Sequence, residues 1–144
     1  FTIINPANHA LSGDATERYK VEPYVVAADV YASLSHVGRG GWTWYTGSAG
    51  WMYRLILESL LGLRLDVDKL RFEPCLPAHW PSFTIHYRYR DTPYHIVVTQ
   101  VPASDGTQAG EVTVVVDGTV RPDGAVPLVD DRQEHTVEVV ATAA

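Results

Sequence analysis

The sequence of 144 residues has little cysteine, little methionine and no long apolar run. Its single cysteine, Cys75, excludes an internal disulfide and a cysteine-rich zinc site, and we expect this small side chain to lie in the core. No apolar stretch approaches the ~20 residues that a membrane-spanning helix needs. The only methionine is Met52, and the chain begins at Phe1. We therefore expect a C-terminal fragment of a larger protein.

Basic residues are also scarce. The chain has 11 Lys and Arg against 17 Asp and Glu, a formal net charge of −6, and no run of basic residues. A nucleic-acid-binding surface needs the opposite balance, so we expect no nucleic-acid partner. A hydrophobic content of 46% with 19% charged residues is that of a folded globular chain. The length suffices for one domain, or for a small domain and part of another.

The most informative stretch is 38–51, which combines glycines, large aromatic residues and a small polar triplet. Its glycines let the backbone approach a ligand, and Trp42 and Trp44 offer flat faces of the kind that stack on sugar rings. Arg39 suits a phosphate or a sugar hydroxyl, and Thr46–Ser48 opens a predicted helix whose first N–H groups attract anions. The residue types predict a carbohydrate site beside an anion pocket. Equally, they fit a glycine-rich connection whose tryptophans fill a core.

Two helices are expected in the first 65 residues. Apolar residues recur at helical spacing over 21–32, and Pro23 suits the first turn of a helix there. Asp29 stands out on this apolar segment as a solvent-facing charge, a paired buried charge or a site carboxylate. The second helix is predicted from Gly47 to about Leu61, is almost entirely apolar, and ends at Gly62.

The pattern changes from helices to strands after about Leu65. Residues 83–90 alternate between polar and apolar, and residues 94–99 form the returning strand of a hairpin. Residues 122–133 are predicted to be a polar loop. We therefore expect an α+β chain, with helices in residues 1–65 packed directly against an antiparallel β-sandwich or roll in residues 66–144. Residues 70–73 also alternate before two prolines break the pattern, and further strands are expected at 111–116, 119–121 and 136–140.

Several motifs occur in an order and spacing that resemble one family, the C-terminal portion of glycoside hydrolase family 94. This family contains cellobiose and chitobiose phosphorylases. Residues 19–31 and 38–45 look closer still to the phosphorylase-like module of cyclic β-1,2-glucan synthases. The resemblance spans about residues 3–90, and the rest of the chain has no such motif. The motifs are Glu22-Pro23-Tyr24-Val25, the run from Trp44 to Trp51, Leu61-Gly62-Leu63, and Pro74-Cys75-Leu76-Pro77 followed by Trp80.

The resemblance implies that residues 1–65 are the last helices of an (α/α)6 barrel and that residues 66–144 are its C-terminal β-sandwich. It implies inverting phosphorolysis, in which inorganic phosphate attacks the anomeric carbon while a carboxylic acid protonates the leaving oxygen. In the synthases, the module is associated with controlling the length of β-1,2-glucan. The general-acid aspartate of the family lies upstream of the matched stretch. We therefore expect no catalytic residue, no metal and no cofactor here beyond phosphate as co-substrate, and no activity from the fragment alone.

The resemblance also implies roles for particular residues. Ala28 stands where some of these phosphorylases have a glutamine, so that contact is absent. The expected partners are a β-glucan oligosaccharide, phosphate, the remainder of the parent chain and possible self-association. The parent is expected at the bacterial inner membrane if it is a synthase, or in the cytoplasm if it is a stand-alone phosphorylase. Phosphate is expected at Thr46, Gly47 and Ser48, and the sugar is expected near Glu22, Arg39, Trp42 and Trp44.

The alternative function is non-catalytic, with a β-sandwich that binds sugar or braces a barrel. It rests on Tyr87, Tyr89 and Tyr94, which are expected to be exposed on the strands. The structural interpretation of these side chains is stronger, because aromatic residues on strands usually pair across a sheet.

Overall fold

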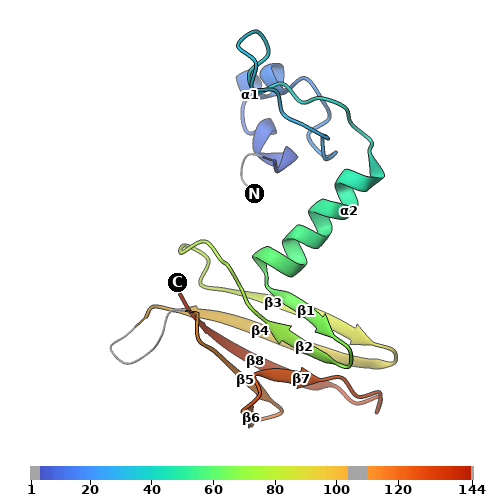
Figure 1. Ribbon diagram of the computed structural model, residues 1–144, viewed down its shortest axis with the longest axis vertical. Coiled ribbons are helices and arrows are strands. Elements are labelled where there is room, and N and C mark those ends of the chain that lie inside the picture. The colour runs from blue at the N-terminus through green and yellow to red at the C-terminus, as the bar shows by residue number, and fades with distance from the viewer. Residues whose placement is uncertain (1–3, 104–109, 144) are drawn as a thin grey trace. The chain divides into compact units, whose positions relative to one another are not determined.

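The computed structural model of the chain describes residues 4–103 and 110–143 and divides into two compact units, Phe1–Arg54 and Leu55–Ala144. Figure 1 shows the helices of the chain from the blue N-terminal region to the green start of the strands. The helices are η1 (Pro6–Ala10, a 3-10 helix), α1 (Gly13–Tyr19), α2 (Thr46–Arg54) and η2 (Leu55–Leu60, a π-helix).

The helix expected from Gly47 to about Leu61 is confirmed, because α2 and η2 follow each other without a break in the sequence. Gly62 ends this run with a φ of 69°, a backbone conformation that side chains with a Cβ adopt at a cost. Its carbonyl also accepts a hydrogen bond from the N–H of Glu73 at 2.9 Å. A Cβ at position 62 would overlap the backbone of Glu73, so the close approach of the two segments requires glycine there.

The helix expected over residues 21–32 is wrong. This segment contains turns and extended backbone, and it pairs with the glycine run through an isolated bridge between Val30 and Gly40. The N–H of Ala28 donates to the Trp42 carbonyl at 2.7 Å, and the N–H of Gly41 donates to the Asp29 carbonyl at 2.9 Å. Glycine permits this pairing, because a Cβ at Gly41 would overlap the Asp29 carboxylate. Asp29 is exposed, as the solvent-facing interpretation required.

The second unit is built from two sheets, in which the described strands follow the orders β1-β2-β7 and β3-β4-β8-β5-β6 (Figure 1). The expected hairpin is confirmed as β3 and β4, and the strands expected at 111–116, 119–121 and 136–140 are β5, β6 and β8. The alternation at 70–73 lies in β2. The strand bounds are β1 (Leu63–Asp66), β2 (Lys69–Phe72), β3 (Ser82–Tyr89), β4 (Thr92–Val101), β5 (Val112–Val116), β6 (Thr119–Arg121), β7 (Ala125–Pro127) and β8 (His135–Thr142).

One pairing departs from the expected antiparallel arrangement. β4 and β8 run parallel, with Tyr94 opposite His135 and Val98 opposite Val139, whereas the other pairs of described strands are antiparallel. A parallel pair needs a long connection, and here that connection includes β5, β6 and β7. The hydrophobic alternation of each strand does not reveal the direction of its partner, so the sequence could not distinguish the two arrangements.

The core lies between the two sheets. Alternate residues of β4 are buried, among them Ile96 and Val98, and they pack in one cluster with Val137 and Val139 of the neighbouring strand. The smaller sheet covers this face with a second set of buried side chains. Because the side chains of a strand alternate between its two faces, one strand can be buried on one face and solvated on the other. The covering residues are Leu63, Leu70, Phe72 and Val126.

Two further expectations in this unit are wrong, and one strand was not predicted. The predicted loop at 122–133 contains β7, whose Val126 is fully buried and pairs with Leu70. Only three residues long and flanked by Asp and Gly, this strand has too short a pattern to be recognised. Cys75 is exposed rather than in the core, since it lies between two prolines in the connection after β2. The strand that was not predicted is β1, at the change from helices to strands near Leu65.

Among the described residues, the structure contains no helix that is both long enough and apolar enough to cross a bilayer.

Candidate functional site

The aromatic stretch of the first unit presents its tryptophans to solvent. The exposed fractions are 70% for Trp42, 67% for Trp44 and 71% for Trp51. These side chains therefore do not fill a core within this chain, contrary to the alternative that the residue types left open. Large exposed aromatic groups on one segment are typical of a ligand or partner surface.

Glu22 and Trp44 are brought together by the fold. The indole N–H of Trp44 donates to Oε1 of Glu22 at 3.2 Å, and the ring of Tyr24 meets the Trp44 ring edge-on with centroids 6.4 Å apart. The pKa of the Glu22 carboxyl is lowered, first by a hydrogen bond from its own backbone N–H and then by the Trp44 indole. Trp44 has a φ of 63°, which is uncommon for a bulky residue. The pair thus presents an ionised carboxylate beside a flat aromatic face.

Trp42 lies on the same segment and contacts a different neighbour. Its ring meets Tyr45 edge-on, with centroids 6.3 Å apart and an interplanar angle of 74°. Its backbone carbonyl is held by the N–H of Ala28. The two tryptophans are therefore fixed by separate contacts, one through the backbone and one through the Glu22 hydrogen bond.

The predicted phosphate contacts form the first residues of α2. Thr46 and Gly47 are exposed, Ser48 is half-buried, and a Cβ at Gly47 would meet no atom within 4 Å. The N–H of Ala49 donates to the Tyr45 carbonyl at 3.3 Å, so the N–H groups of the three preceding residues lie ahead of the helical ladder. Such groups are free to bind an anion, and the helix dipole favours one there.

Arg39 lies in another environment from the one predicted for it. It lines a pocket of 370 Å³ together with residues 34–37 and with Arg18 and Lys20 from the end of α1. Trp42 and Trp44 do not line this pocket. Arg18 and Lys20 were not among the residues predicted from the sequence, because no helix was expected over residues 13–19. Only the fold places them beside a loop that is some twenty residues further along the chain.

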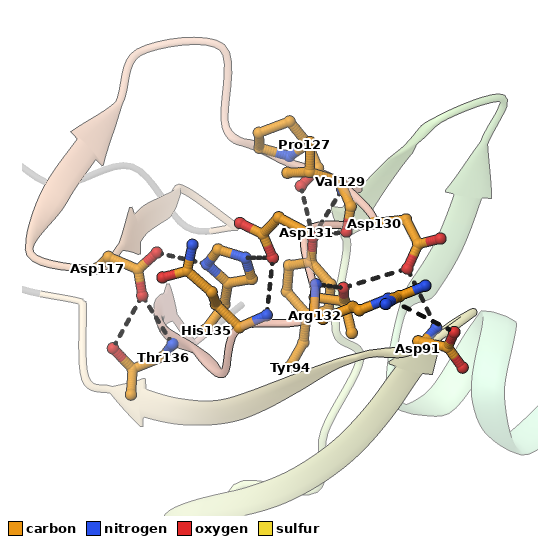
Figure 2. Close-up of polar contacts among 12 residues, drawn as sticks. Asp91, Tyr94, Asp117, Pro127, Val129, Asp130, Asp131, Arg132, His135 and Thr136 are labelled. Carbon is orange, nitrogen blue, oxygen red and sulfur yellow. Dashed lines mark hydrogen bonds and ion pairs between the residues drawn. The ribbon is translucent and has the colours of Figure 1, made fainter.

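The second unit contains a separate polar network around His135 (Figure 2). Its Nδ1 lies 2.7 Å from Oδ2 of Asp117, and its Nε2 lies 3.2 Å from Oδ1 of Asp131. Because an ionised carboxylate accepts but does not donate, both ring nitrogens donate when the imidazole is protonated. Accordingly, the pKa of His135 is raised, mainly by the hydrogen bond to Asp117. The same bond lowers the pKa of Asp117, whereas a hydrogen bond from the Gln133 N–H is the main cause of the lowered pKa of Asp131.

Tyr94 links this network to the loop after β7. Its ring stacks on His135 with centroids 4.8 Å apart, and its hydroxyl accepts from the N–H of Val129 at 2.7 Å and lies 3.1 Å from the carbonyl of the same residue. Only 1% of Tyr94 is exposed, and burial raises the pKa of its hydroxyl. Tyr87 and Tyr89 are half-buried against the core. The prediction that these tyrosines are exposed is therefore wrong, and Tyr94 packs in the core of the second unit.

No three His, Cys, Asp or Glu side chains within residues 4–103 and 110–143 are grouped so that they could hold a metal ion.

Comparison with known families divides the chain into two matched regions. Residues 1–62 match the Glycosyl hydrolase 94 superfamily, catalytic domain, and residues 63–120 match the Glycosyl hydrolase family 65, C-terminal domain. The junction coincides with the start of β1 at Leu63.

Similar proteins include one synthase and several phosphorylases. The chain is 47% identical to the cyclic beta-(1,2)-glucan synthase NdvB of Rhizobium meliloti (strain 1021) over 83% of its length, which is 4% of that protein. It is 38% identical to the 3-O-beta-D-glucopyranosyl-beta-D-glucuronide phosphorylase of Paenibacillus borealis over 61% of its length, 11% of that protein. It is 33% identical to the N,N'-diacetylchitobiose phosphorylase of Vibrio furnissii over 80% of its length, 14% of that protein. The chain thus spans a small part of each relative.

Proposed function

The chain belongs to the glycosyl hydrolase 94 superfamily through residues 1–62 and continues into a family 65 C-terminal domain, and from this we propose that it supplies one wall of a carbohydrate phosphorylase site. In this proposal, a longer protein cleaves or transfers β-glucan with phosphate as co-substrate. The general acid comes from outside the 144 residues, so the chain alone is inactive. The relatives named as phosphorylases and as a glucan synthase support both the reaction class and the substrate class.

One observation supports the site most directly. The exposed start of α2, with Thr46 and Gly47, follows immediately after the exposed faces of Trp42 and Trp44. The N–H groups that would hold a phosphate at the helix start thus belong to residues that directly follow two tryptophans suited to a sugar ring. Glu22, bonded to the Trp44 indole, would present its carboxylate to a sugar hydroxyl. Phosphorolysis requires this neighbourhood of anion and sugar, because phosphate attacks the anomeric carbon directly.

In this proposal, the β-sandwich has a structural role and does not bind the sugar. Its buried tyrosine and the His135 network tie strands and loops to one another and leave no stacked aromatic surface on those residues for sugar. The exposed aromatic residues of the first unit would be covered by the rest of the longer chain. The isolated fragment should therefore self-associate through them, which light scattering coupled to size exclusion would detect.

The test measures glucose 1-phosphate release from β-1,2-glucooligosaccharides by the 144-residue chain and by the longer protein containing it. We expect release only from the longer protein. In that protein, Thr46→Val removes one hydroxyl without changing the side-chain size and should raise the KM for phosphate about tenfold. Thr113→Val, on the exposed side of β5, is the matched control and should leave KM unchanged. Release by the 144-residue chain alone would refute the proposal, as would an unaltered KM in Thr46→Val.

A further inference from the structure

The pocket at the end of α1 gathers positive charge in an otherwise acidic chain. The chain has a formal net charge of −6, yet Arg18, Lys20 and Arg39 all line this one pocket of 370 Å³. Ser35 and His36 add polar atoms, with Ser35 Oγ 2.7 Å from His36 Nδ1. The volume falls at the lower end of the range for small-molecule sites, about 300–1,000 Å³.

Backbone hydrogen bonds hold Lys20 and Arg39 in place, and the stem of Arg18 packs against the backbone. Lys20 is the left-handed C-cap of α1, with a φ of 58° and its N–H bonded to the Thr16 carbonyl. The stem of Arg18 lies over Gly38, where a Cβ would come within 2.9 Å of Cδ of the arginine. Arg39 is held on both sides, since its N–H donates to the His36 carbonyl and its own carbonyl accepts from Tyr31. The backbone thus holds the three residues that carry these charges around one pocket before any ligand arrives.

The described residues offer these cations no carboxylate partner. Within the part of the chain that the structure describes, none of the three forms an ion pair, and neither Asp nor Glu lines the pocket. Cations near a helix C-terminus do compensate the helix dipole, which would account for Arg18 and Lys20. It does not account for Arg39, which comes from a different segment and adds a third like charge at a cost in repulsion.

We propose that this pocket binds the phosphate group of a small molecule, either inorganic phosphate or a sugar phosphate. A phosphate carries a charge of about −1.5 to −2 near neutral pH, which three neighbouring cations would balance. Two guanidinium groups can each donate paired hydrogen bonds to phosphate oxygens, and lysine adds a point charge. The site is distinct from the phosphate contact proposed at the start of α2, because none of Thr46–Ser48 lines it.

The test is calorimetric titration of the 144-residue chain at low ionic strength with inorganic phosphate, glucose 1-phosphate, glucose 6-phosphate and glucose. We expect saturable binding of the phosphate-bearing probes and none of glucose. Arg18→Gln and Arg39→Gln should each weaken binding about tenfold. Arg39→Lys keeps the charge but cannot donate the paired hydrogen bonds of a guanidinium group, and should weaken binding less. Arg64→Gln removes an exposed guanidinium paired with Glu73 and serves as the matched control. A sugar phosphate that binds at least about tenfold more tightly than inorganic phosphate identifies the organic ligand, and equal affinities identify free phosphate.

Thr46→Val separates this pocket from the start of α2. Binding that survives Thr46→Val and weakens in Arg39→Gln supports the pocket. Absence of saturable binding by every phosphate probe overturns it, and so does binding that is lost in Thr46→Val but unaltered in the two glutamine variants. Far-ultraviolet circular dichroism of each variant establishes that it is folded before it is titrated. Should Arg18→Gln disturb the fold through its contact with Gly38, the Arg39 variants decide the question.

Discussion

Replacing His135 by phenylalanine is the sharpest test of how the second unit is held together. Phenylalanine keeps an aromatic ring to stack on Tyr94, whose centroid lies 4.8 Å from that of His135. It removes both nitrogens, and with them the contacts to Asp117 and Asp131. The variant therefore isolates the polar interactions from the packing.

The expected loss of stability comes mainly from the contact of His135 with Asp117, which at 2.7 Å is the shorter of the two. A hydrogen bond to a charged group contributes about 1.5–3 kcal/mol, but the Asp117 side chain is 47% exposed and solvent screens it. We therefore expect His135→Phe to lower the free energy of unfolding by about 1–2 kcal/mol where His135 is protonated. For a unit of this size, that corresponds to a fall in Tm of about 4–16 °C.

The destabilisation caused by His135→Phe depends on pH in a direction set by the pKa shifts of His135 and Asp117. The pKa of His135 is raised above its ordinary value of 6.5, so its contribution is complete below pH 6.5 and is lost as pH rises through the raised pKa. The pKa of Asp117 is lowered from 3.8, so its contribution is present above pH 3.8 and is lost as pH falls through the lowered pKa. The pair should be most stabilising between these two ordinary values.

The assay is thermal unfolding followed by circular dichroism at about pH 5.5 and about pH 8.5, on either side of the ordinary histidine pKa. The wild-type chain, His135→Phe and His79→Phe are compared, since His79 is exposed and lies in the connection before β3, outside this network. We expect the variant to differ from the wild type at the lower pH and to approach it at the higher one. An equal loss at both pH values would refute the electrostatic reasoning, as would a loss no larger than that of the control.

Three other perturbations test the fold. Gly62→Ala should destabilise the second unit by more than about 2 kcal/mol in chemical denaturation, because the added Cβ overlaps the backbone of Glu73 and the φ of Gly62 is unfavourable for alanine. Gly118→Ala is the control: its φ is 76° but the space around it is open, so it should cost only about 1 kcal/mol. Equal losses in the two variants would contradict the overlap. Ile96→Ala should cost about 2–5 kcal/mol because Ile96 is fully buried, whereas Val120→Ala at an exposed position of β6 should change stability by less than about 0.5 kcal/mol. Similar losses of stability in the two variants would contradict the burial of Ile96 in the core. Cys75 should react with a thiol reagent in the folded protein nearly as fast as in denaturant, and protection would contradict its exposure.

Much of the second unit could be predicted from the sequence, because its strands have local patterns. The alternation over residues 83–90 and 94–99 determines β3 and β4, since side chains on a strand alternate between its faces. The apolar run after Gly47 determines the helix that ends before Gly62 for the same kind of reason. The motif order from Glu22 to Trp80 indicated the family, which the matches to residues 1–62 and 63–120 confirm.

The sequence by itself therefore determined the elements with strong periodicity and the family to which they belong. Only the tertiary structure decided where weakly patterned segments find partners. Residues 21–32 have apolar residues at helical spacing, yet their backbone pairs with the glycine run, because hydrogen bonds to a distant segment outweigh a weak local preference. The burial of Tyr94, the parallel pairing of β4 with β8 and the meeting of Arg39 with Arg18 depend likewise on contacts between residues far apart in the chain. Local periodicity contains no information about such contacts, which is the physical reason that the sequence left them open.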